Sequence, residues 1–345
     1  MLPDKRHDGV EFKDSDCKHD RGFRAKLAKF PLEFLAAFMQ KRGDWAWLKQ
    51  AFNLQEWKSG GGDAYMCWKC QCTARLMREF HLWAPWRQTM HTHKTFMADV
   101  IRSARGMLPL LILPGFLVDY VVPDLMHCGC LGVCPAAVGN ILWELFKELG
   151  GVIAHPDKVL GMLIVMIISA SKDLKMQPPV TTLTVGMIRR EGKPAYARLK
   201  AAECRHMLPV CVHMLRHYFE HDTPHKQHRL ECITLLCDAY RMMEPEQWNP
   251  KTTPPELAVT GRKFCIVYGE LSRESIESGD IFGQYWRLYP KFHMFLHIVE
   301  DEDSTDNPRE SWSYPDESEI GDAADLAATL HPRTVGHTLM ERYRI

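Results

Sequence analysis

The stretch Leu-Gly-Val-Cys-Pro-Ala-Ala-Val-Gly-Asn-Ile-Leu-Trp-Glu-Leu-Phe-Lys-Glu-Leu, residues 131–149, decides the fold class of this chain. Its apolar side chains return every three or four residues, which is the spacing of one face of an α-helix. The stretch therefore predicts a helix with one apolar face. The side chains at this spacing are Val138, Ile141, Leu142, Leu145 and Leu149.

The chain after this stretch continues the helical pattern. Proline pairs such as Pro178-Pro179 and Pro254-Pro255 separate successive segments, because proline cannot continue a helix. No internal repeat is present. The predicted helices are residues 157–172, 200–220, 228–243 and 256–278, with further helices at 93–105 and 318–345.

The chain before residue 131 predicts a little β-structure. Two apolar runs, residues 108–113 and 116–122, flank a Pro-Gly pair, and the second run is rich in Val and Tyr. Such a run predicts a buried strand. A shorter apolar segment near residues 30–45 adds a second element of this kind. The sequence as a whole therefore predicts a mainly α fold with a small mixed β-sheet.

Composition narrows the class of protein. The chain has 345 residues, of which 46% are hydrophobic and 25% charged. That balance excludes a wholly disordered chain, a collagen and a coiled coil, and the length suits one large core or two smaller ones. Lys and Arg together number 43, as do Asp and Glu, so the formal net charge is zero. A strongly basic nucleic-acid coat is thereby excluded, although a local basic patch is not.

The sequence also predicts a compartment. The first residues lack the apolar stretch of a signal peptide, so we expect an intracellular protein that is not secreted. The longest apolar run, Val159 to Ile168, is shorter than the roughly 20 residues that cross a bilayer, so we expect no membrane association. In a reducing compartment the 12 cysteines should be thiols or metal ligands rather than disulfides.

Cys67 and Cys70 are separated by two residues, the spacing at which two thiolates form half of a zinc site. No second pair follows at the spacing of a zinc finger, and buried free thiols are the alternative interpretation. If Zn²⁺ is bound at the Cys67/Cys70 loop, we expect the other ligands nearby in the sequence. The candidates are Cys72 and His93, with His81 and His91 as further histidines in the same region.

His293 and His297 form a second candidate pair. They are one helical turn apart, so both rings can bind one ion. The three residues between them, Met-Phe-Leu, lack the glutamate of the His-Glu-x-x-His signature of zinc proteases. The spacing therefore allows metal chelation, and it is not the signature of a zinc protease.

Three carboxylates lie at the predicted ends of strands or starts of helices, where a metal ligand could be placed. Asp124 ends the predicted strand and has His127 three residues on, Asp44 begins a predicted helix, and Glu317 lies at the start of the last helix. A carboxylate at a strand end could bind a metal. The same carboxylates could instead cap turns or helix N-termini, so the residues alone leave both interpretations open.

The order of these motifs resembles the later part of a CACTA-type (En/Spm-like) DDE transposase. The resemblance runs over residues 8–345 through short motifs, and its most specific piece is Asp124-Leu-Met-His127 with Gly132 five residues on. Residues 201–205 match the insertion region of such proteins. The other pieces are Gly43-Asp44-Trp45, Cys67-x2-Cys70, Pro290-Lys-Phe-His293-x3-His297 and Trp312-Ser-Tyr-Pro-Asp-Glu317-x3-Gly321.

The resemblance implies a partial ribonuclease-H-like core interrupted by a helical insertion. It implies a nuclear enzyme that cleaves and joins DNA strands with two Mg²⁺ or Mn²⁺ ions held by three carboxylates. It matches Asp44 to the second catalytic Asp, Asp124 and His127 to the Asp-x-x-His motif that follows it, and Glu317 to the last carboxylate. The implied division is a polar arm (1–29), a partial core with the cysteine loop (30–135), a helical insertion (136–285) and a C-terminal segment that closes the core (286–345).

One carboxylate that the resemblance implies has no match here. The family's first catalytic Asp lies on an opening strand, whereas only the polar residues 1–29 precede the predicted core. We therefore expect this chain to lack strand transfer and to bind DNA, its ancestral partner, weakly at most. The alternative is a non-enzymatic helical interaction module with a zinc-stabilised loop, which would bind protein partners through an exposed apolar patch on the helical block.

Overall fold

The computed structural model describes residues 48, 49, 52, 54, 65–102, 111, 116–152, 155–279, 285–301, 306–314, 322, 325–330 and 338. Over these residues the protein is mainly α-helical and contains no β-strand, because its extended pairings are isolated bridges. The helices are α3 (His93–Arg102), α4 (Cys134–Glu148), α5 (Pro156–Asp173), α6 (Val185–Ile188), α7 (Ala201–Tyr218), α8 (Pro224–Met242), α9 (Thr253–Glu277) and α10 (Pro290–Val299). Shorter elements are the π-helical η5 (Met126–Val133) and the 3₁₀ turns η1 (Leu76–Arg78), η2 (Pro85–Thr89), η4 (Val118–Tyr120) and η6 (Pro308–Ser311).

The helices predicted between residues 131 and 278 are confirmed as α4, α5, α7, α8 and α9. The quoted stretch begins in η5 and continues as α4, whose first turn contains Pro135. Because this helical stretch is continuous, Pro135 leaves the carbonyl of Leu131 without its helical N–H, and that carbonyl accepts from Tyr196 and Lys291 instead. The helix predicted at 93–105 is formed as α3, which ends at Arg102.

The strand predicted over residues 116–122 is wrong. Val118 begins the 3₁₀ turn η4, and its backbone N–H donates to Nδ1 of His93 on α3 at 3.3 Å. Val118 is buried, so the apolar run reflects burial in a turn, which a short apolar pattern cannot distinguish from burial in a strand. Apart from Leu111, the run at 108–113 and the predicted β-structure near residues 30–45 lie outside the described residues.

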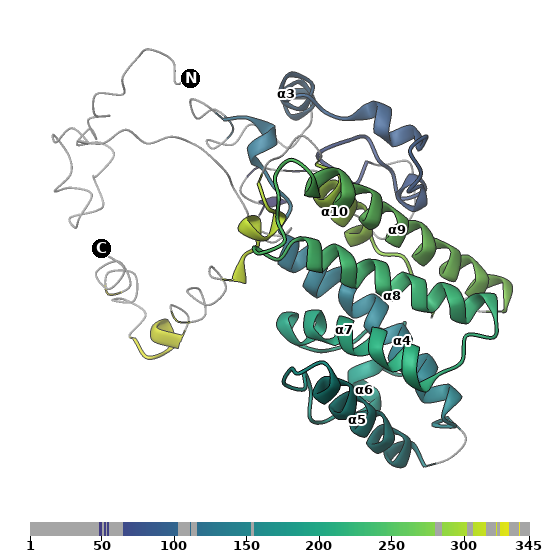
Figure 1. Ribbon diagram of the computed structural model, residues 1–345. Coiled ribbons are helices and arrows are strands. Elements are labelled where there is room, and N and C mark those ends of the chain that lie inside the picture. Colours follow the sequence, from purple (N-terminus) through teal and green to yellow (C-terminus); the bar gives the residue numbers. More distant parts are fainter. Residues whose placement is uncertain are drawn as a thin grey trace.

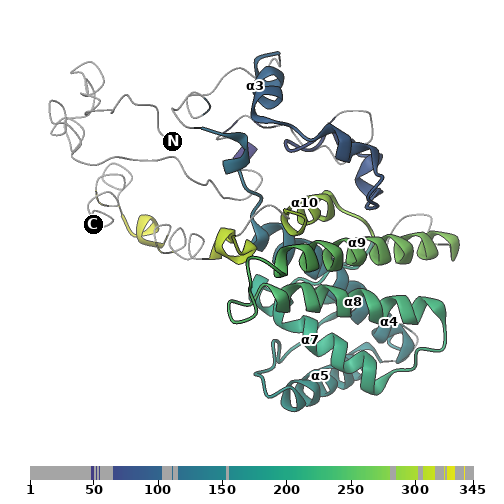
Figure 2. The ribbon, with the colours of Figure 1, turned by 45° about the horizontal axis from the view of Figure 1, so that its top comes forward.

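The long helices form a stack in which neighbours in sequence are mostly neighbours in space (Figure 1). Helix α8 packs between α7 and α9, and α10 packs on α9 and η5. Helix α4 contacts α7 and α8, and most of its side chains are buried. Helix α5 lies beyond α7 at the outer edge of the stack (Figures 1 and 2).

One helical stretch among the described residues, Met126–Glu148, is long and apolar enough to cross a membrane by length and composition. Its mean hydropathy is 1.4 over an 18-residue window, and 89% of that window is buried inside the protein. A core helix passes the same test. The apolar composition of this stretch therefore agrees with the central place of α4 in the stack.

Gly139 lies where α4 meets the loop before α7. A Cβ atom at this position would lie 2.4 Å from the backbone nitrogen of Ala197 and 2.6 Å from Cα of Tyr196. That nitrogen donates to the carbonyl of Pro135 at 2.8 Å, which fixes the loop against the helix. The close approach of the two backbones thus depends on the absence of a side chain at residue 139.

We expect Gly139→Ala to lower the free energy of unfolding by about 1–3 kcal/mol, because the added methyl group must displace backbone. Gly161→Ala is the matched control, since nothing lies within 4 Å of a Cβ atom at this exposed position of α5. Alanine there should stabilise the helix by up to about 1 kcal/mol. Urea denaturation of both variants measures the difference, and effects of the same sign and size would contradict the packing argument.

Candidate metal centre

The loop that carries the first cysteine pair is closed by an isolated bridge between Tyr65 and Thr73. Within it, the backbone N–H of Lys69 donates to Sγ of Cys67 at 3.2 Å. Cys67 and Cys70 are 2% and 0% exposed. The loop therefore buries both sulfurs and already provides one of them with the N–H donor that stabilises a thiolate.

The second pair of ligands comes from α10. This helix begins at Pro290, and His293 and His297 lie one turn apart on one of its faces. Both imidazoles are buried, His293 at 0% and His297 at 8% exposure. The helix thus holds two ring nitrogens at a separation that a single ion can span.

The two pairs meet. Sγ of Cys70 lies 3.3 Å from Nε2 of His293 and 3.6 Å from Nε2 of His297. Sγ of Cys67 lies 3.4 Å from Nε2 of His297, and the two Nε2 atoms are 3.0 Å apart. All four ligand atoms lie within 4.8 Å of one another.

These separations suit a tetrahedral ion. Zinc bonds of about 2.3 Å to sulfur and about 2.0–2.1 Å to nitrogen place neighbouring ligand atoms about 3.3–3.8 Å apart. The separations of 3.0 to 3.6 Å lie in or just below that range. Two thiols and two imidazoles form a Cys2His2 set, so the group could hold a metal such as zinc.

Burial shifts the pKa values of Cys67, Cys70 and His297. It raises the pKa of the Cys67 thiol well above its usual value, and a hydrogen bond with Cys70 adds to this. A bond with Cys67 lowers the pKa of Cys70, but bonding with Cys72 and burial raise it, to about 12 overall. The pKa of His297 lies well below its usual value because of burial and of the nearby His293. His297 is therefore neutral at pH 7, the form that binds a metal, and a metal must displace the thiol protons.

An aromatic side chain and an ion pair enclose the centre. The ring of Trp86, on η2, meets the rings of His293 and His297 edge-on, with centroids 4.6 Å and 5.4 Å apart. The guanidinium of Arg87 lies 4.5 Å above the Trp86 ring and donates to both carboxylate oxygens of Glu300, at 2.7 Å and 3.0 Å. These contacts tie η2 to the end of α10 independently of any metal.

Cys72 and His93, the ligands expected from the local sequence, lie outside the four-residue group. Sγ of Cys72 donates to a backbone carbonyl at 3.4 Å, and Nδ1 of His93 accepts the N–H of Val118. His293 and His297 take their place. Sequence spacing could identify each pair but not their meeting, because 223 residues separate Cys70 from His293.

Asp124 is buried, and its carboxylate accepts five hydrogen bonds. The donors are the backbone N–H groups of Met126 and His127, the ring of His127, and the N–H and Oγ of Ser313. Burial raises the pKa of Asp124, but the bonds with His127 and Ser313 outweigh it and hold the pKa below the usual value. The carboxylate therefore caps the start of η5 and anchors residue 313, and these bonds use the lone pairs that a metal would need.

Asp44 and Glu317 lie outside the described residues. The meeting of Asp44, Asp124 and Glu317 around two metal ions therefore stays a prediction of the resemblance. Ser313 was not expected at the Asp124 site, and only its place in the motif that begins at Trp312 could have suggested it.

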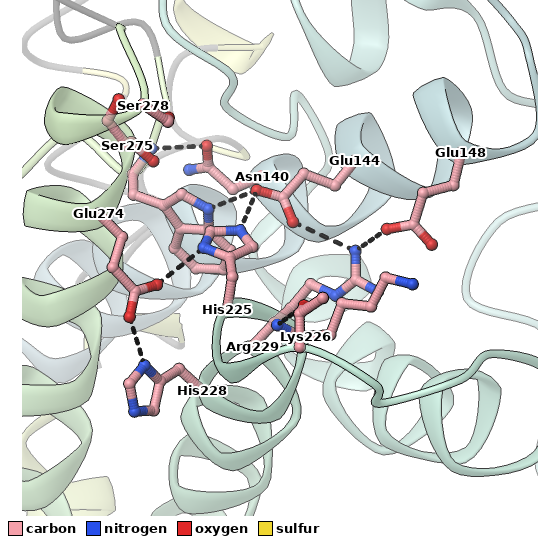
Figure 3. A network of polar contacts seen from close by, with 12 residues as sticks. Asn140, Glu144, Glu148, His225, Lys226, His228, Arg229, Glu274, Ser275 and Ser278 are labelled. Carbon is pink, nitrogen blue, oxygen red and sulfur yellow. Dashed lines mark hydrogen bonds and ion pairs between the residues drawn. The ribbon is translucent and has the colours of Figure 1, made fainter.

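A second cluster of ionisable groups joins α4, α8 and α9 (Figure 3). Glu144 is buried and accepts bonds from Nη1 of Arg229 at 3.2 Å and Nε1 of Trp286 at 2.6 Å. Nε2 of His225 lies 3.0 Å from Glu144, and its Nδ1 lies 2.8 Å from Glu274. Both ring nitrogens of His225 therefore face carboxylates, which favours the imidazolium. The cluster pairs charges between helices, and no local motif had indicated it.

The fold and this site define the class as a mainly α-helical protein with a buried Cys2His2 group. No family model, no curated protein and no solved structure matches the chain.

We expect Cys70→Ser and His297→Ala each to reduce bound zinc from about one ion per chain to near none, because each removes one of four ligands. Cys72→Ser is the matched control, since it changes an equally buried thiol that lies outside the group. Elemental analysis of protein purified in the presence of zinc measures the content. Zinc retained in Cys70→Ser, or lost in Cys72→Ser, would contradict this ligand set.

The network predicts a pH dependence above pH 6. The bond with Glu144, followed by that with Glu274, raises the pKa of His225 above its usual value despite burial. The folded state therefore holds a proton that the unfolded chain releases near pH 6.5, and the stability due to His225 falls as pH rises through its folded pKa. Denaturation at pH 6 and pH 8.5 should show this loss in the wild type.

His225→Asn should reduce that difference between the two pH values. A His155→Asn control, at an exposed residue outside the network, should leave it as in the wild type. A wild-type protein that is equally stable at both pH values, or a His225→Asn variant that keeps the full difference, would refute the role of His225.

Proposed function

We propose that this chain is a transposase-derived protein that acts as a zinc-stabilised helical module. The observation that carries the proposal is the meeting of Cys67 and Cys70 with His293 and His297 in one buried group. Four protein ligands would leave no open coordination position, which is the arrangement of structural rather than catalytic zinc.

The metal would fasten residues 65–90 to the helical block. The longest regular element in that segment is the five-residue turn η2. A segment with so little regular secondary structure gains order from links to its surroundings, and metal binding contributes directly to folding free energy. Trp86 and Arg87 make the neighbouring contacts, so the zinc would complete an existing junction with α10.

The transposase origin draws support from the same site. Two of the motifs that carry the resemblance, Cys67-x2-Cys70 and His293-x3-His297, contribute the two halves of one centre. On this proposal both halves were inherited together from the ancestral enzyme. On this proposal, residues 30–135 and 286–345 belong to a partial ribonuclease-H-like core, and α4 to α9 form the helical insertion.

Phosphoryl transfer on DNA with Mg²⁺ or Mn²⁺ is, on this proposal, the ancestral chemistry that this chain has lost. The carboxylate of Asp124 supports this, because it caps the start of η5 and its five hydrogen bonds use the lone pairs that a metal ion would need. DNA would then be a weak, ancestral partner in the nucleus, and protein partners would take its place.

The test uses the full chain with and without its metal. We expect about one zinc per chain, and we expect a chelator to increase protease cleavage within residues 65–90 while the far-ultraviolet helical signal largely persists. DNA incubated with the protein and Mn²⁺ should remain uncut. Protein that binds no zinc would refute the module. DNA cleavage that Asp124→Asn abolishes, in a variant whose circular dichroism and zinc content match the wild type, would instead support a working transposase core.

A further inference from the structure

A second pair of histidines lies one turn apart on α7, where this helix passes the end of α5. The centroids of the His213 and His217 rings are 4.3 Å apart. In the buried metal centre, His293 and His297 have the same spacing in sequence, and their ring centroids are 4.5 Å apart with the Nε2 atoms at 3.0 Å. The α7 pair therefore has the ring separation at which two imidazoles can share one ion.

A carboxylate from the neighbouring helix faces this pair. Asp173 is the last residue of α5, and its Oδ2 lies 3.2 Å from Nε2 of His213. Bonds of about 2.0–2.2 Å to nitrogen and oxygen place two ligands of one ion about 2.8–3.6 Å apart at octahedral or tetrahedral angles. The hydroxyl of Tyr218 on α7 donates to Oγ of Ser169 on α5 at 3.2 Å. This bond holds the two helix ends together, so the carboxylate lies beside the histidines without a metal.

The exposure of these side chains sets the kind of site that they can form. Among the described residues, only the buried group has three or more such ligand atoms gathered within 4.8 Å of one another. An ion on α7 therefore requires one side chain to turn. The side chain of Asp173 is 54% exposed, and His217 is exposed as well, so either can turn in solvent without disturbing the core. Such a site closes around its ion on binding and releases it readily.

His221 continues the spacing of the pair but is engaged elsewhere. It lies four residues after His217, beyond the end of α7 at Tyr218. Its Nε2 donates to the carbonyl of Leu215 at 2.9 Å. Asp173, rather than a third histidine, is therefore the ligand that completes the set.

We propose that His213, His217 and Asp173 form a second metal site, which binds an exchangeable divalent transition-metal ion such as Zn²⁺ or Ni²⁺. Imidazole nitrogens select this class of ion over Mg²⁺ and Ca²⁺, which prefer oxygen ligands. Three protein ligands leave at least one coordination position for water or for a ligand from solution, whereas the four ligands of the buried group leave none. The ion would link the end of α5 to α7.

The second site is independent of the zinc-stabilised module, because it shares no residue with the buried group. Its exposure predicts weaker binding, so gel filtration without free metal should remove its ion before elemental analysis. The zinc that remains after this step belongs to the buried group. Nickel binding that persists in Cys70→Ser belongs to α7 whether or not the buried group holds zinc, so either proposal can fail while the other stands.

Calorimetric titration of Ni²⁺ into the full, zinc-loaded chain measures the second site. We expect the wild type to take up about one Ni²⁺ per chain. His217→Asn and Asp173→Asn should each weaken the affinity at least about tenfold, because even the loss of an outer-shell partner costs about 10- to 100-fold. His206→Asn is the matched control, since it changes an exposed histidine of the same helix outside the set, and it should bind as the wild type does.

Circular dichroism and zinc content establish that each variant is folded. A wild type that takes up no Ni²⁺ would overturn the proposal, and so would a His217→Asn variant that binds Ni²⁺ as tightly as the wild type. A His206→Asn variant that loses as much affinity as His217→Asn would show that the ion does not depend on this pair, which overturns the proposal as well.

A second substitution tests whether Asp173 binds the ion directly. Asp173→His removes the negative charge but keeps a ligand atom at this position, so it should bind Ni²⁺ at least as tightly as the wild type, unlike Asp173→Asn. Asp157→Asn, at the exposed start of α5, is the control for the loss of a carboxylate and should leave the affinity unchanged. An Asp173→His variant that binds as weakly as Asp173→Asn would refute coordination by residue 173.

Discussion

The buried carboxylate of Glu144 constrains the helical block, because a charge removed from water must meet counter-charges and hydrogen-bond donors inside the protein. Arg229 on α8 and the indole of Trp286 provide them. Trp286 is held a second time, since its backbone N–H donates to Oδ1 of Asn140 on α4 at 2.8 Å. The chain is therefore fixed four residues before α10 begins, and the position of His293 follows from that anchor.

The candidate metal centre combines two elements. Helix α10 is held by several other contacts, whereas the cysteine loop has little regular secondary structure. Nζ of Lys291 donates to the carbonyl of Leu131 at 2.8 Å, and the rings of Tyr268 and Phe292 pack with centroids 4.3 Å apart. These contacts pre-position the two imidazoles on α10. The cysteine loop has bridges and turns of its own, and Trp86 brings it against the same helix. A metal at this junction would join parts of the chain whose other contacts already bring them together.

Helices were predictable because their apolar period is a local property that survives folding. The strand predicted around Val118 was wrong because a short apolar run is a local pattern that a buried turn produces equally well. The spacing of Cys67 and Cys70 indicated two ligands and that of His293 and His297 allowed two more, but the sequence pointed to nearby Cys72 and His93 as the partners of the cysteines. Their meeting, and the bonds of Ser313 to Asp124, depend on contacts between segments more than 180 residues apart, which no local pattern contains.

Three of the motifs that carry the resemblance to transposases make buried structural contacts in the described part of the chain. The two ligand pairs close a junction, and Asp124 holds the start of η5 to residue 313. A motif with such a structural role can persist whether or not the chain catalyses strand transfer. Replacing one of its residues would leave a buried carboxylate or thiol without its partners. These contacts explain the motifs by their part in the fold, so the motifs alone are no evidence of catalytic activity.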